Sequence, residues 1–425
     1  MTAPIRVPLA DVKYREDLYP RIKADPAVIQ RYAADLDVLP PIEVNQHNEL
    51  IDGFHRWTAH RKAEAETIAV TVTETASDVE LLALACERNA KHGLQLNDRD
   101  KASMAVRLFH AGAGLDEASI AQALSVSARM VRGYLSDVKA DLRKQQREKV
   151  FSLWLQCWTQ EQIARAVGLE QPRVVEIVQE ISDLEALPNP IKLAAMYQDA
   201  DWQPPLFDVW TASRNNNAVK HYGNTAAEFV DNLLYTFTDP FDIVIDPFAG
   251  GGSTIDVCTK RMRRYWVSDR KPIVERETEI RCHDIATHGI SGPSRWGDVA
   301  LVYLDPPYWK QAEGKYSDDP TDLANMPLEQ FTETLVGIIH GYADKLKPGA
   351  HVACIISPTQ WPNEDKSTVY HDIDLAREVK RKLTLVRRVS CPYSTEQYNG
   401  TQVNIAKERK LWLALTRTML VWQRV

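Results

Sequence analysis

The sequence predicts an α/β protein whose C-terminal half is a doubly wound, mainly parallel sheet, preceded by a small α/β unit and helical modules. Three observations support this prediction. Residues 207–425 alternate apolar runs of strand length with helical stretches, which is typical of a parallel sheet with helices on both faces. Residues 1–76 combine strand and helix signals, whereas residues 77–140 and 141–190 show helical periodicity alone. Prolines within 183–206 indicate a linker before the large sheet.

Composition limits the classes of function. Of the 425 residues, 44% are hydrophobic and 26% are charged, which is ordinary for a globular protein. No apolar run reaches about 18 residues and the N-terminus has no leader pattern, so we expect a cytoplasmic protein without a membrane span. The six cysteines are scattered without a CxxC pair, which predicts reduced thiols and no metal site. A net charge of −7 does not exclude nucleic acid, because phosphate contacts need only local basic patches.

Residues 1–76 have the pattern of a small sheet with a covering helix. A strand is expected at Ile42–Val44, and a second short strand is expected to end at Asp52. A helix follows over 54–63. The alternating β-branched residues of IAVTVTE predict a further strand at 68–72, which completes the unit.

Two helical pairs follow in tandem. LDEASIAQALSVSARMVRGYLSDV contains two short helices that break at 125–127, where Ser127 can cap the second helix. WTQEQIARAVGLEQPRVVEIVQEI breaks near Pro172, which suits the first turn of a helix. Each pair is either a plain helical hairpin or a helix-turn-helix whose second helix enters the DNA major groove. The tandem arrangement favours DNA reading.

The strands of residues 207–425 are marked by apolar runs bounded by turns. These runs are DIVIDP, YWVSD, VALVYLD, HVACII, TLVRRVS and LWLALTRTMLVW. Helical stretches separate most of them, which predicts parallel neighbours. The last two are joined without an obvious long helix, so we expect them to form an antiparallel hairpin at one edge of the sheet.

A glycine-rich turn follows the first of these strands. The segment VIDPFAGGGST runs from an apolar strand into a turn, and a helix is expected to begin near Ser253. Glycines let a ligand approach the backbone, and a helix N-terminus favours a negative group such as a carboxylate. The candidate ligand-binding residues are Asp246, Pro247, Phe248, Gly250 and Gly252. A dinucleotide site, although GxGxxG is absent, and a turn without a ligand are the alternatives.

Two further acids stand where they could bind the same ligand. Asp269 ends the strand YWVSD, and an acid at this place can accept both hydroxyls of a ribose. Asp284 lies near the end of a short third strand, where it could accept an adenine amino group. The alternative for Asp284 is an ordinary surface aspartate.

The motif Asp305-Pro306-Pro307-Tyr308 follows the apolar strand VALVYL. An exocyclic amine on an aromatic ring is a poor nucleophile, because its lone pair is delocalised. The carboxylate of Asp305 and the backbone carbonyl of Pro306 can accept its two hydrogens and free the lone pair. The prolines make the turn rigid, and Tyr308 offers a ring face to a base that has left the duplex. The motif therefore predicts catalysis on a base amine.

Residues 207–425 resemble the DNA amino-methyltransferases that make N6-methyladenine or N4-methylcytosine. VIDPFAGGGST resembles their cofactor motif and DPPYW their catalytic motif. The resemblance implies a Rossmann-like fold, S-adenosylmethionine as donor, no metal and no covalent intermediate. It also implies that residues 221–224, with Asn224 as a candidate, help to hold the methionine end of the donor. The leading Asp305 favours adenine over cytosine, and the cytosine-N4 product stays an alternative.

Residues 1–140 resemble ParB-type partition proteins. LIDGFHRWTAH stands where that family has a nucleotide-contacting motif, and ACERNAKHGLQLND resembles its second motif. The resemblance implies double-stranded DNA as partner and association with the nucleoid. Gly53, His55 and Arg56 either bind a nucleotide phosphate or serve a structural role in DNA docking. A homodimer is left open, as is a partner nuclease.

The chain departs from typical DNA amino-methyltransferases in having no room for a separate target-recognition domain. The segments 310–322, 359–371 and 394–410 are all short. Sequence reading is therefore expected to depend on the N-terminal modules, with these loops helping. The other readings are a ParB-like regulatory protein with a decayed enzyme domain, and an RNA or protein-glutamine methyltransferase. Tandem helix-turn-helix units favour duplex DNA, because A-form RNA hides its major groove.

Overall fold

The structure, a computed structural model, describes most of the chain. The described residues are 3–20, 25–91, 96–111, 115–182, 205–212, 225–360, 368–393 and 398–425. They form two compact units, Met1–Gln146 and Arg147–Val425. No helix among them is long and apolar enough to cross a membrane. The expected linker at 183–206 lies almost wholly outside the described residues.

The first unit begins with a four-stranded sheet in the order β1-β4-β2-β3. Its elements are β1 (Ile5–Pro8), η1 (Leu9–Asp11), α1 (Pro26–Ala33), β2 (Ile42–Val44), β3 (Leu50–Asp52), α2 (Phe54–Lys62) and β4 (Thr67–Val72). The predicted strands and helix of this part are confirmed to within a residue. Gly53 begins α2 at a φ of 100°, and a Cβ there would lie 2.6 Å from Ile42 Cγ2, so this turn requires glycine.

Helices make up the rest of the first unit. They are α3 (Asp78–Lys91), α4 (Asp98–Ala111), α5 (Glu117–Ala123) and α6 (Ala128–Tyr134). Ile120 and Leu124 of the first helix-turn-helix pair pack with Val131 and Met104 in one buried cluster. Ser127 caps α6 as predicted, because its hydroxyl accepts a hydrogen bond from the backbone N–H of Met130. Helix α7 (Ser136–Leu155) passes from the first unit into the second.

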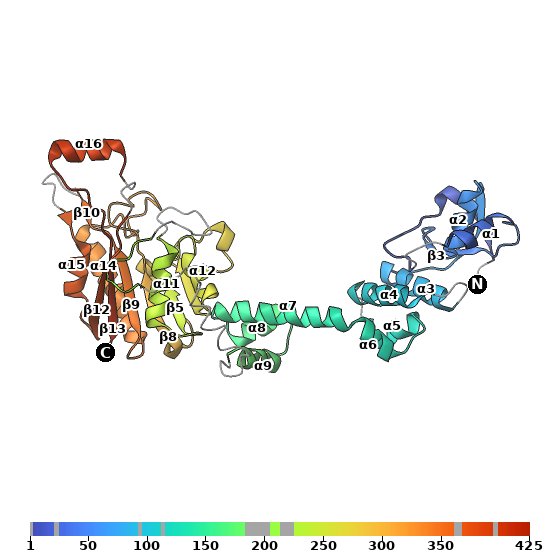
Figure 1. The fold of residues 1–425 in the computed structure, drawn as a ribbon, viewed down its shortest axis with the longest axis horizontal. Helices are drawn as coiled ribbons and strands as arrows, with labels where there is room; N and C mark the ends of the chain where they lie inside the picture. The colour runs from blue at the N-terminus through green and yellow to red at the C-terminus, as the bar shows by residue number, and fades with distance from the viewer. Residues whose placement is uncertain are drawn as a thin grey trace. The chain divides into compact units, whose positions relative to one another are not determined.

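The second unit is built on a seven-stranded sheet in the order β12-β13-β9-β8-β5-β6-β7 (Figure 1). Its strands are β5 (Ile243–Asp246), β6 (Arg264–Asp269), β7 (Arg281–Cys282), β8 (Val299–Leu304), β9 (His351–Ile356), β12 (Leu383–Ser390) and β13 (Thr418–Arg424). Strands β5 to β9 are parallel, and β13 is antiparallel to both of its neighbours. The predicted antiparallel pair at one edge is therefore confirmed, with β13 lying between β12 and β9.

Helices cover both faces of this sheet. They are α11 (Ala227–Phe237), α12 (Ser253–Lys260), α13 (Ile285–His288), α14 (Leu328–Lys345) and α15 (His371–Glu378), with short turns η2 (Val274–Arg276) and η3 (Trp296–Asp298). Alternate strand residues enter two different cores. Leu301 of β8 packs in the cluster that contains Phe229 of α11, whereas Val302 packs in the cluster that contains Leu335 of α14. The doubly wound fold class is confirmed.

The second helical pair belongs to the core of the large sheet. Helices α8 (Gln160–Val167) and α9 (Gln171–Ser182) bury Ile163, Val174 and Ile177 in the same cluster as Trp154 and Phe229. The apolar face of this pair thus packs the two helices into the second unit.

Two predictions near the C-terminus were wrong. The segment 394–410 was expected to be a short loop, but it carries α16 (Gly400–Arg409), which Asn399 and Gln402 begin with a reciprocal capping box. The apolar run from Leu411 was expected to be strand throughout, yet β13 begins only at Thr418. Its neighbour β9 ends at Ile356, and Pro358 lacks the N–H that would extend the ladder. A separate two-stranded ribbon of β10 (Thr359–Gln360) and β11 (Thr368–Val369) follows.

Candidate active site

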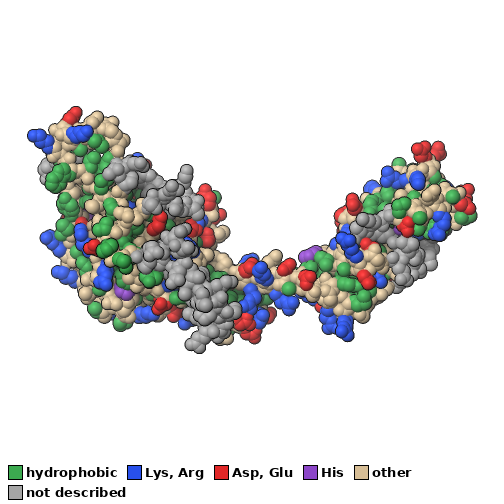
Figure 2. All heavy atoms as spheres, in the orientation of Figure 1, with side chains coloured by type: hydrophobic (Ala, Val, Ile, Leu, Met, Phe, Trp, Pro, Cys, Tyr) green, Lys and Arg blue, Asp and Glu red, His purple; other side chains and the backbone are tan. Residues whose placement is uncertain are grey.

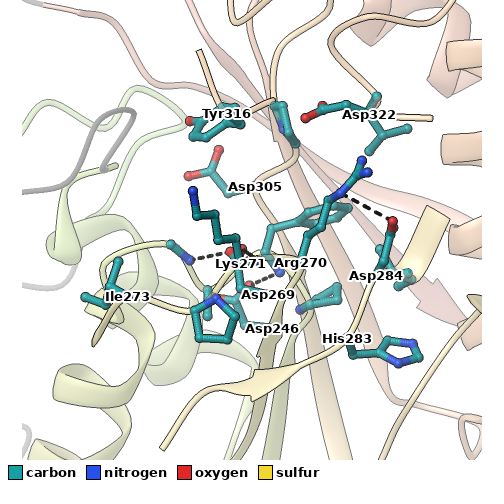
Figure 3. Close-up of a pocket in the computed structure, with 18 of the residues that line it drawn as sticks. Asp246, Asp269, Arg270, Lys271, Ile273, His283, Asp284, Asp305, Tyr316 and Asp322 are labelled. Carbon is teal, nitrogen blue, oxygen red and sulfur yellow. Dashed lines mark hydrogen bonds and ion pairs between the residues drawn. The ribbon is translucent and has the colours of Figure 1, made fainter. Parts of the chain in front are cut away.

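A pocket of about 650 Å³ opens where β5, β6 and β8 end. Ligands of open α/β sheets bind at this carboxyl edge, because the loops that follow parallel strands meet there. The four predicted acids Asp246, Asp269, Asp284 and Asp305 all line the pocket, as do Pro247, Phe248, Gly250 and Pro307 (Figure 3). Residues from four separate segments of the sequence are thus brought together.

Asp246 organises the glycine-rich turn from within. Its Oδ1 accepts the backbone N–H of Phe248 at 2.9 Å, and its Oδ2 accepts the hydroxyl of Thr254 at 2.6 Å. Gly252, at a φ of 80°, begins helix α12, a conformation that side chains rarely adopt. Burial raises the pKa of Asp246 to about 7. Asp246 therefore fixes the turn and can take up a proton near neutral pH.

Asp269 and Asp284 lie on the next two loops. Asp269 accepts the N–H of Gly250 and the N–H of Lys271, both at 2.9 Å, and so ties its loop to the glycine-rich turn. Asp284 caps α13 through the N–H of Ala286 at 3.0 Å. Its Oδ2 lies 3.4 Å from Nε of Arg270. Asp284 is a partly buried residue of the pocket wall rather than a free surface aspartate.

Asp305 follows β8 and is surrounded by hydroxyl groups. It accepts hydrogen bonds from the phenol groups of Tyr308 at 3.2 Å and Tyr303 at 3.4 Å, and from the hydroxyl of Thr225. Burial raises the pKa of Asp305, while these donors and the charge of Arg417 lower it. Burial also raises the pKa of both tyrosines well above its usual value, so both keep the protons that they donate.

Of the other residues of the motif, Pro307 lines the pocket. Pro306 is buried, and neither it nor Tyr308 is part of the pocket wall. Tyr308 uses its hydroxyl to bind Asp305. The roles predicted for the Pro306 carbonyl and for the ring of Tyr308 stay predictions.

The segment after the motif forms one wall of the pocket. Tyr316 and Asp322 belong to this segment and line the pocket on the side of Asp305 (Figure 3). Arg270 holds the segment from the opposite loop, because its guanidinium pairs with Asp319 and donates to the hydroxyl of Thr321 at 3.3 Å. Arg270 therefore connects Asp284 to the segment that covers the pocket.

Sequence reasoning missed Tyr303, Thr225, Arg270 and Arg417. Tyr303 had a usable signal, because a residue two positions before Asp305 points to the same face of a strand. Arg417 lies far from the motif in sequence, and no local pattern marks it. Asn224 and its neighbours, which were predicted to hold the methionine end of the donor, lie outside the described residues.

The motif at 53–56 in the first unit is engaged by the protein itself. Arg56 pairs with Asp52 at 2.8 Å and donates to the carbonyls of Pro40 and Pro41 at 3.1 and 2.8 Å. His55 is buried, and its Nε2 accepts the N–H of Asp25 at 3.0 Å. These contacts favour the structural role that was one of the two alternatives for this motif.

The two helix-turn-helix pairs present different charges. The expected recognition helix α6 exposes Arg129 and Arg132. The corresponding helix α9 exposes Glu176 and Glu180, which pair with Arg173 and Arg147. Arg132 lies 3.8 Å from Glu117 of α5, and each glutamate of α9 is matched by an arginine. The face of α6 is therefore the more basic of the two and suits a phosphate backbone better.

One family model matches the part of the chain that contains α9 and the glycine-rich turn. A family described as DNA methylase, of the N6 and N4 type, has a model that fits this part of the chain. Residues 141–276 match the DNA methylase family. The match covers Asp246 and Asp269 and supports methyl transfer to an amino group in DNA. It implies S-adenosylmethionine as the methyl donor.

No curated protein matches the chain. Among solved structures, the chain is similar to the chromosome-partitioning protein ParB of Caulobacter crescentus bound to parS, at 17% identity, covering 47% of this chain and 94% of that chain, with a TM-score of 0.25. It is also similar to an S-adenosylmethionine-dependent methyltransferase of Clostridium acetobutylicum, at 12% identity, 48% and 92% coverage, and a TM-score of 0.28. TrmN of Thermus thermophilus gives 14% identity, 47% and 48% coverage, and a TM-score of 0.28. TM-scores this low add nothing to the assignment.

The pocket fits the implied donor. S-adenosylmethionine carries a sulfonium and an ammonium group, and acidic side chains in the pocket wall outnumber basic ones. The acidic residues are Asp246, Asp269, Glu275, Asp284, Asp305 and Asp322, and the basic residues are Arg270, Lys271 and Lys315. Phe248, Ile273 and Ile285 add apolar surface suited to the adenine ring. Among the described residues, no cluster of three or more His, Cys, Asp and Glu side chains could hold a metal ion.

Proposed function

We propose that this protein is a site-specific DNA methyltransferase that acts on the N6 amino group of adenine. The observation that carries the proposal is Asp305, a carboxylate that receives three hydroxyl hydrogen bonds at the edge of a donor-sized pocket. Asp305 lines the same pocket as Asp246 and Asp269. A base amine bound at Asp305 would therefore lie near the methyl donor.

The chain's own residues prepare the amine for attack. Asp305 accepts one amine hydrogen and the backbone carbonyl of Pro306 accepts the other, which localises the lone pair on nitrogen. S-adenosylmethionine, when bound, would supply an electrophilic methyl group, with the sulfur leaving as a neutral thioether. The amine would give up one N–H proton in exchange, and Asp305, which accepts that hydrogen, would receive it. Tyr303 and Tyr308 hold the Asp305 carboxylate in place through their hydroxyl groups. The target base has to leave the duplex to reach this pocket.

Duplex DNA binds, on this proposal, through two basic elements. Helix α6 of the first helix-turn-helix offers Arg129 and Arg132. Helix α16 offers Lys407, Arg409 and Lys410, all exposed. Lys and Arg side chains are visible on the segment that carries α16 (Figure 2). The segment that carries α16 leaves the sheet at the edge where Asp305 lies, since Thr418 pairs with Ile356 at the end of β9. Residues 1–76 dock DNA rather than a nucleotide phosphate, because Arg56 is already paired with Asp52.

The test is methyl transfer by the full chain to duplex DNA, with the product nucleoside identified by mass spectrometry. N6-methyladenine is the expected product, and N4-methylcytosine is the alternative that the motif also allows. Asp305→Ala should lower the rate at least about 100-fold while donor binding persists. Substantial activity in Asp305→Ala would overturn the assigned mechanism. Long-read sequencing of DNA from expressing cells would give the recognition site.

A further inference from the structure

Arg417 is a buried arginine that the proposed reaction does not yet use. It directly precedes β13, and only 7% of its surface is exposed. Strand β13 pairs with β9, and β9 pairs with β8, which ends next to Asp305. The sheet therefore brings Arg417 to the catalytic edge. Burying a guanidinium is unfavourable unless its charge is compensated, so this position calls for an explanation.

The guanidinium is held by several groups around the catalytic motif. Its Nε donates to the carbonyl of Cys391 at 3.3 Å, and its Nη1 donates to the hydroxyl of Thr225 at 3.3 Å. The guanidinium carbon lies 4.2 Å from the ring centre of Tyr393 and 5.3 Å from that of Phe229. These contacts fix both the place and the plane of the guanidinium, which the single ammonium of lysine could not reproduce.

The bond to Thr225 has a fixed direction. An arginine has only N–H donors, so the Thr225 hydroxyl must accept from Arg417. A threonine hydroxyl has one proton, and Thr225 donates that proton to Asp305. Arg417, Thr225 and Asp305 thus form a hydrogen-bonded chain that ends on the catalytic carboxylate, with every proton pointing toward it.

We propose that Arg417 is a positioning residue that acts through Thr225 to keep Asp305 an ionised acceptor for the hydrogens of the target amine. The proposal rests on the proposed function, because it gives Asp305 that task. A protonated Asp305 would present an O–H donor to the amine and could not take its hydrogen on that oxygen. Burial favours the protonated form, and Arg417 opposes it.

Other charged and titratable groups also face this site. Asp246 on β5 disfavours a second negative charge on Asp305, because the two carboxylates repel each other. Tyr303, Tyr308 and Tyr393 stand around the carboxylate as neutral phenols, and burial raises the pKa of each. The thiols Cys354 and Cys391 have pKa values raised by burial and are neutral as well. Arg270, Lys271 and Lys315 also line the pocket. Arg417 is the buried cation whose charge favours the ionised form of Asp305.

The experiment measures the ionisation of Asp305 and the rate in parallel, in the full chain. Arg417→Gln removes the charge, and Thr225→Val removes the hydroxyl while keeping the shape of the side chain. Single-turnover methylation rates are recorded against pH at saturating DNA and S-adenosylmethionine. Both variants should shift the acidic limb of the profile upward by about one pH unit, a tenfold change in the ratio of ionised to neutral Asp305. Thr225→Ser should restore the limb, because it restores the hydroxyl.

A matched control separates this effect from lost packing. Arg264 is comparably buried, and its guanidinium carbon lies 4.8 Å from the ring of Trp154, away from the pocket wall. Arg264→Gln should lower thermal stability without moving the acidic limb. If Arg417→Gln does not fold, the acidic limb measured for Thr225→Val is sufficient to test the proposal. An acidic limb that is unmoved in folded Thr225→Val overturns the proposal.

A second readout does not depend on methyl transfer. The carboxyl pKa of Asp305 can be measured by infrared difference spectroscopy against Asp305→Asn. It should rise in Thr225→Val even if the wild-type chain proves inactive on DNA. A raised pKa with no DNA methylation would contradict the proposed function and leave the Arg417–Thr225–Asp305 chain standing. If the wild-type chain methylates DNA but the pKa of Asp305 is unchanged in Thr225→Val, the proposed function stands and the role of the Arg417–Thr225–Asp305 chain is contradicted.

Discussion

The hydroxyl of Thr254 lies 2.6 Å from Oδ2 of Asp246 and joins the last residue of β5 to the first turn of α12. The bond spans the glycine-rich turn, so the acid and the helix move as one piece. Asp246 is buried beneath this turn, and its pKa is raised to about 7. The ionisation of one side chain is therefore coupled to the wall of the donor pocket.

Donor affinity should depend on pH through Asp246. A carboxyl with a raised pKa is protonated below about pH 7, and a cationic donor favours its ionised form. Binding should therefore release a proton, and affinity should rise with pH and level off above about pH 7, with a slope that approaches tenfold per pH unit. Titration calorimetry in buffers of different ionisation enthalpy would measure the proton released.

The matched control is Asp246→Asn, which keeps the size of the side chain and removes its titration. Its donor affinity should be weaker above pH 7 and should lose most of the slope. S-adenosylhomocysteine, which lacks the sulfonium charge, should show a smaller slope with the wild-type chain. Equal slopes for the charged and uncharged ligands would contradict the coupling.

Arg270 should control how tightly the donor is held. It links Asp284 on one loop to Asp319 and Thr321 on the segment that covers the pocket. Arg270→Gln should weaken donor binding by about tenfold, the range expected when one hydrogen-bonded ion pair is lost, with little change in DNA affinity. Arg295→Gln is the control, because Arg295 pairs with Asp298 outside the pocket wall. Fluorescence titration of both variants would show the difference, and equal donor affinities would rule out the link.

DNA binding should depend on α6 and not on α9. Replacing Arg129 and Arg132 by Gln should weaken DNA binding, because each lost phosphate contact lowers the slope of log affinity against log salt by about 0.9. Arg173→Gln on α9 is the control, since Arg173 stands on a helix that also exposes Glu176 and Glu180. Fluorescence anisotropy at several salt concentrations gives both slopes. A larger loss from Arg173→Gln would reverse the assignment of the two helix-turn-helix pairs.

The site acids were predictable because each is marked by its own local sequence. Asp246, Asp269 and Asp305 all follow apolar runs, and the carboxyl ends of parallel strands meet at one edge. Local sequence therefore placed them in one pocket. Thr225 and Arg417 could not be found this way, because only the order of strands in the sheet brings them to Asp305.

The helical segments show which structural features the hydrophobic pattern does not predict. The hydrophobic periodicity of α8 and α9 predicts an apolar face on each helix but not what that face packs against. In the structure these faces pack into the core of the large sheet, so the two helices are not an independent module. Helix α16 was not predicted, although Asn399 and Gln402 carry the signal of a capping box at its start. Its exposed position, beside a Trp412 that is 94% exposed, also leaves little apolar periodicity to read.

Stability of the catalytic unit should depend on an ion pair between α11 and the end of α12. Arg261 donates through Nε and Nη2 to the two carboxylate oxygens of Asp231, at 2.7 and 2.6 Å, and its side chain is fully buried. Asp231→Ala leaves that guanidinium without its counter-charge, so it should lower the free energy of unfolding by about 3–5 kcal/mol. Replacing both residues by leucine removes the charge together with its partner and should cost much less. Chemical denaturation of the single and double variants measures both values. If the double variant were as unstable as Asp231→Ala, the loss would come from packing around α11 rather than from an uncompensated charge.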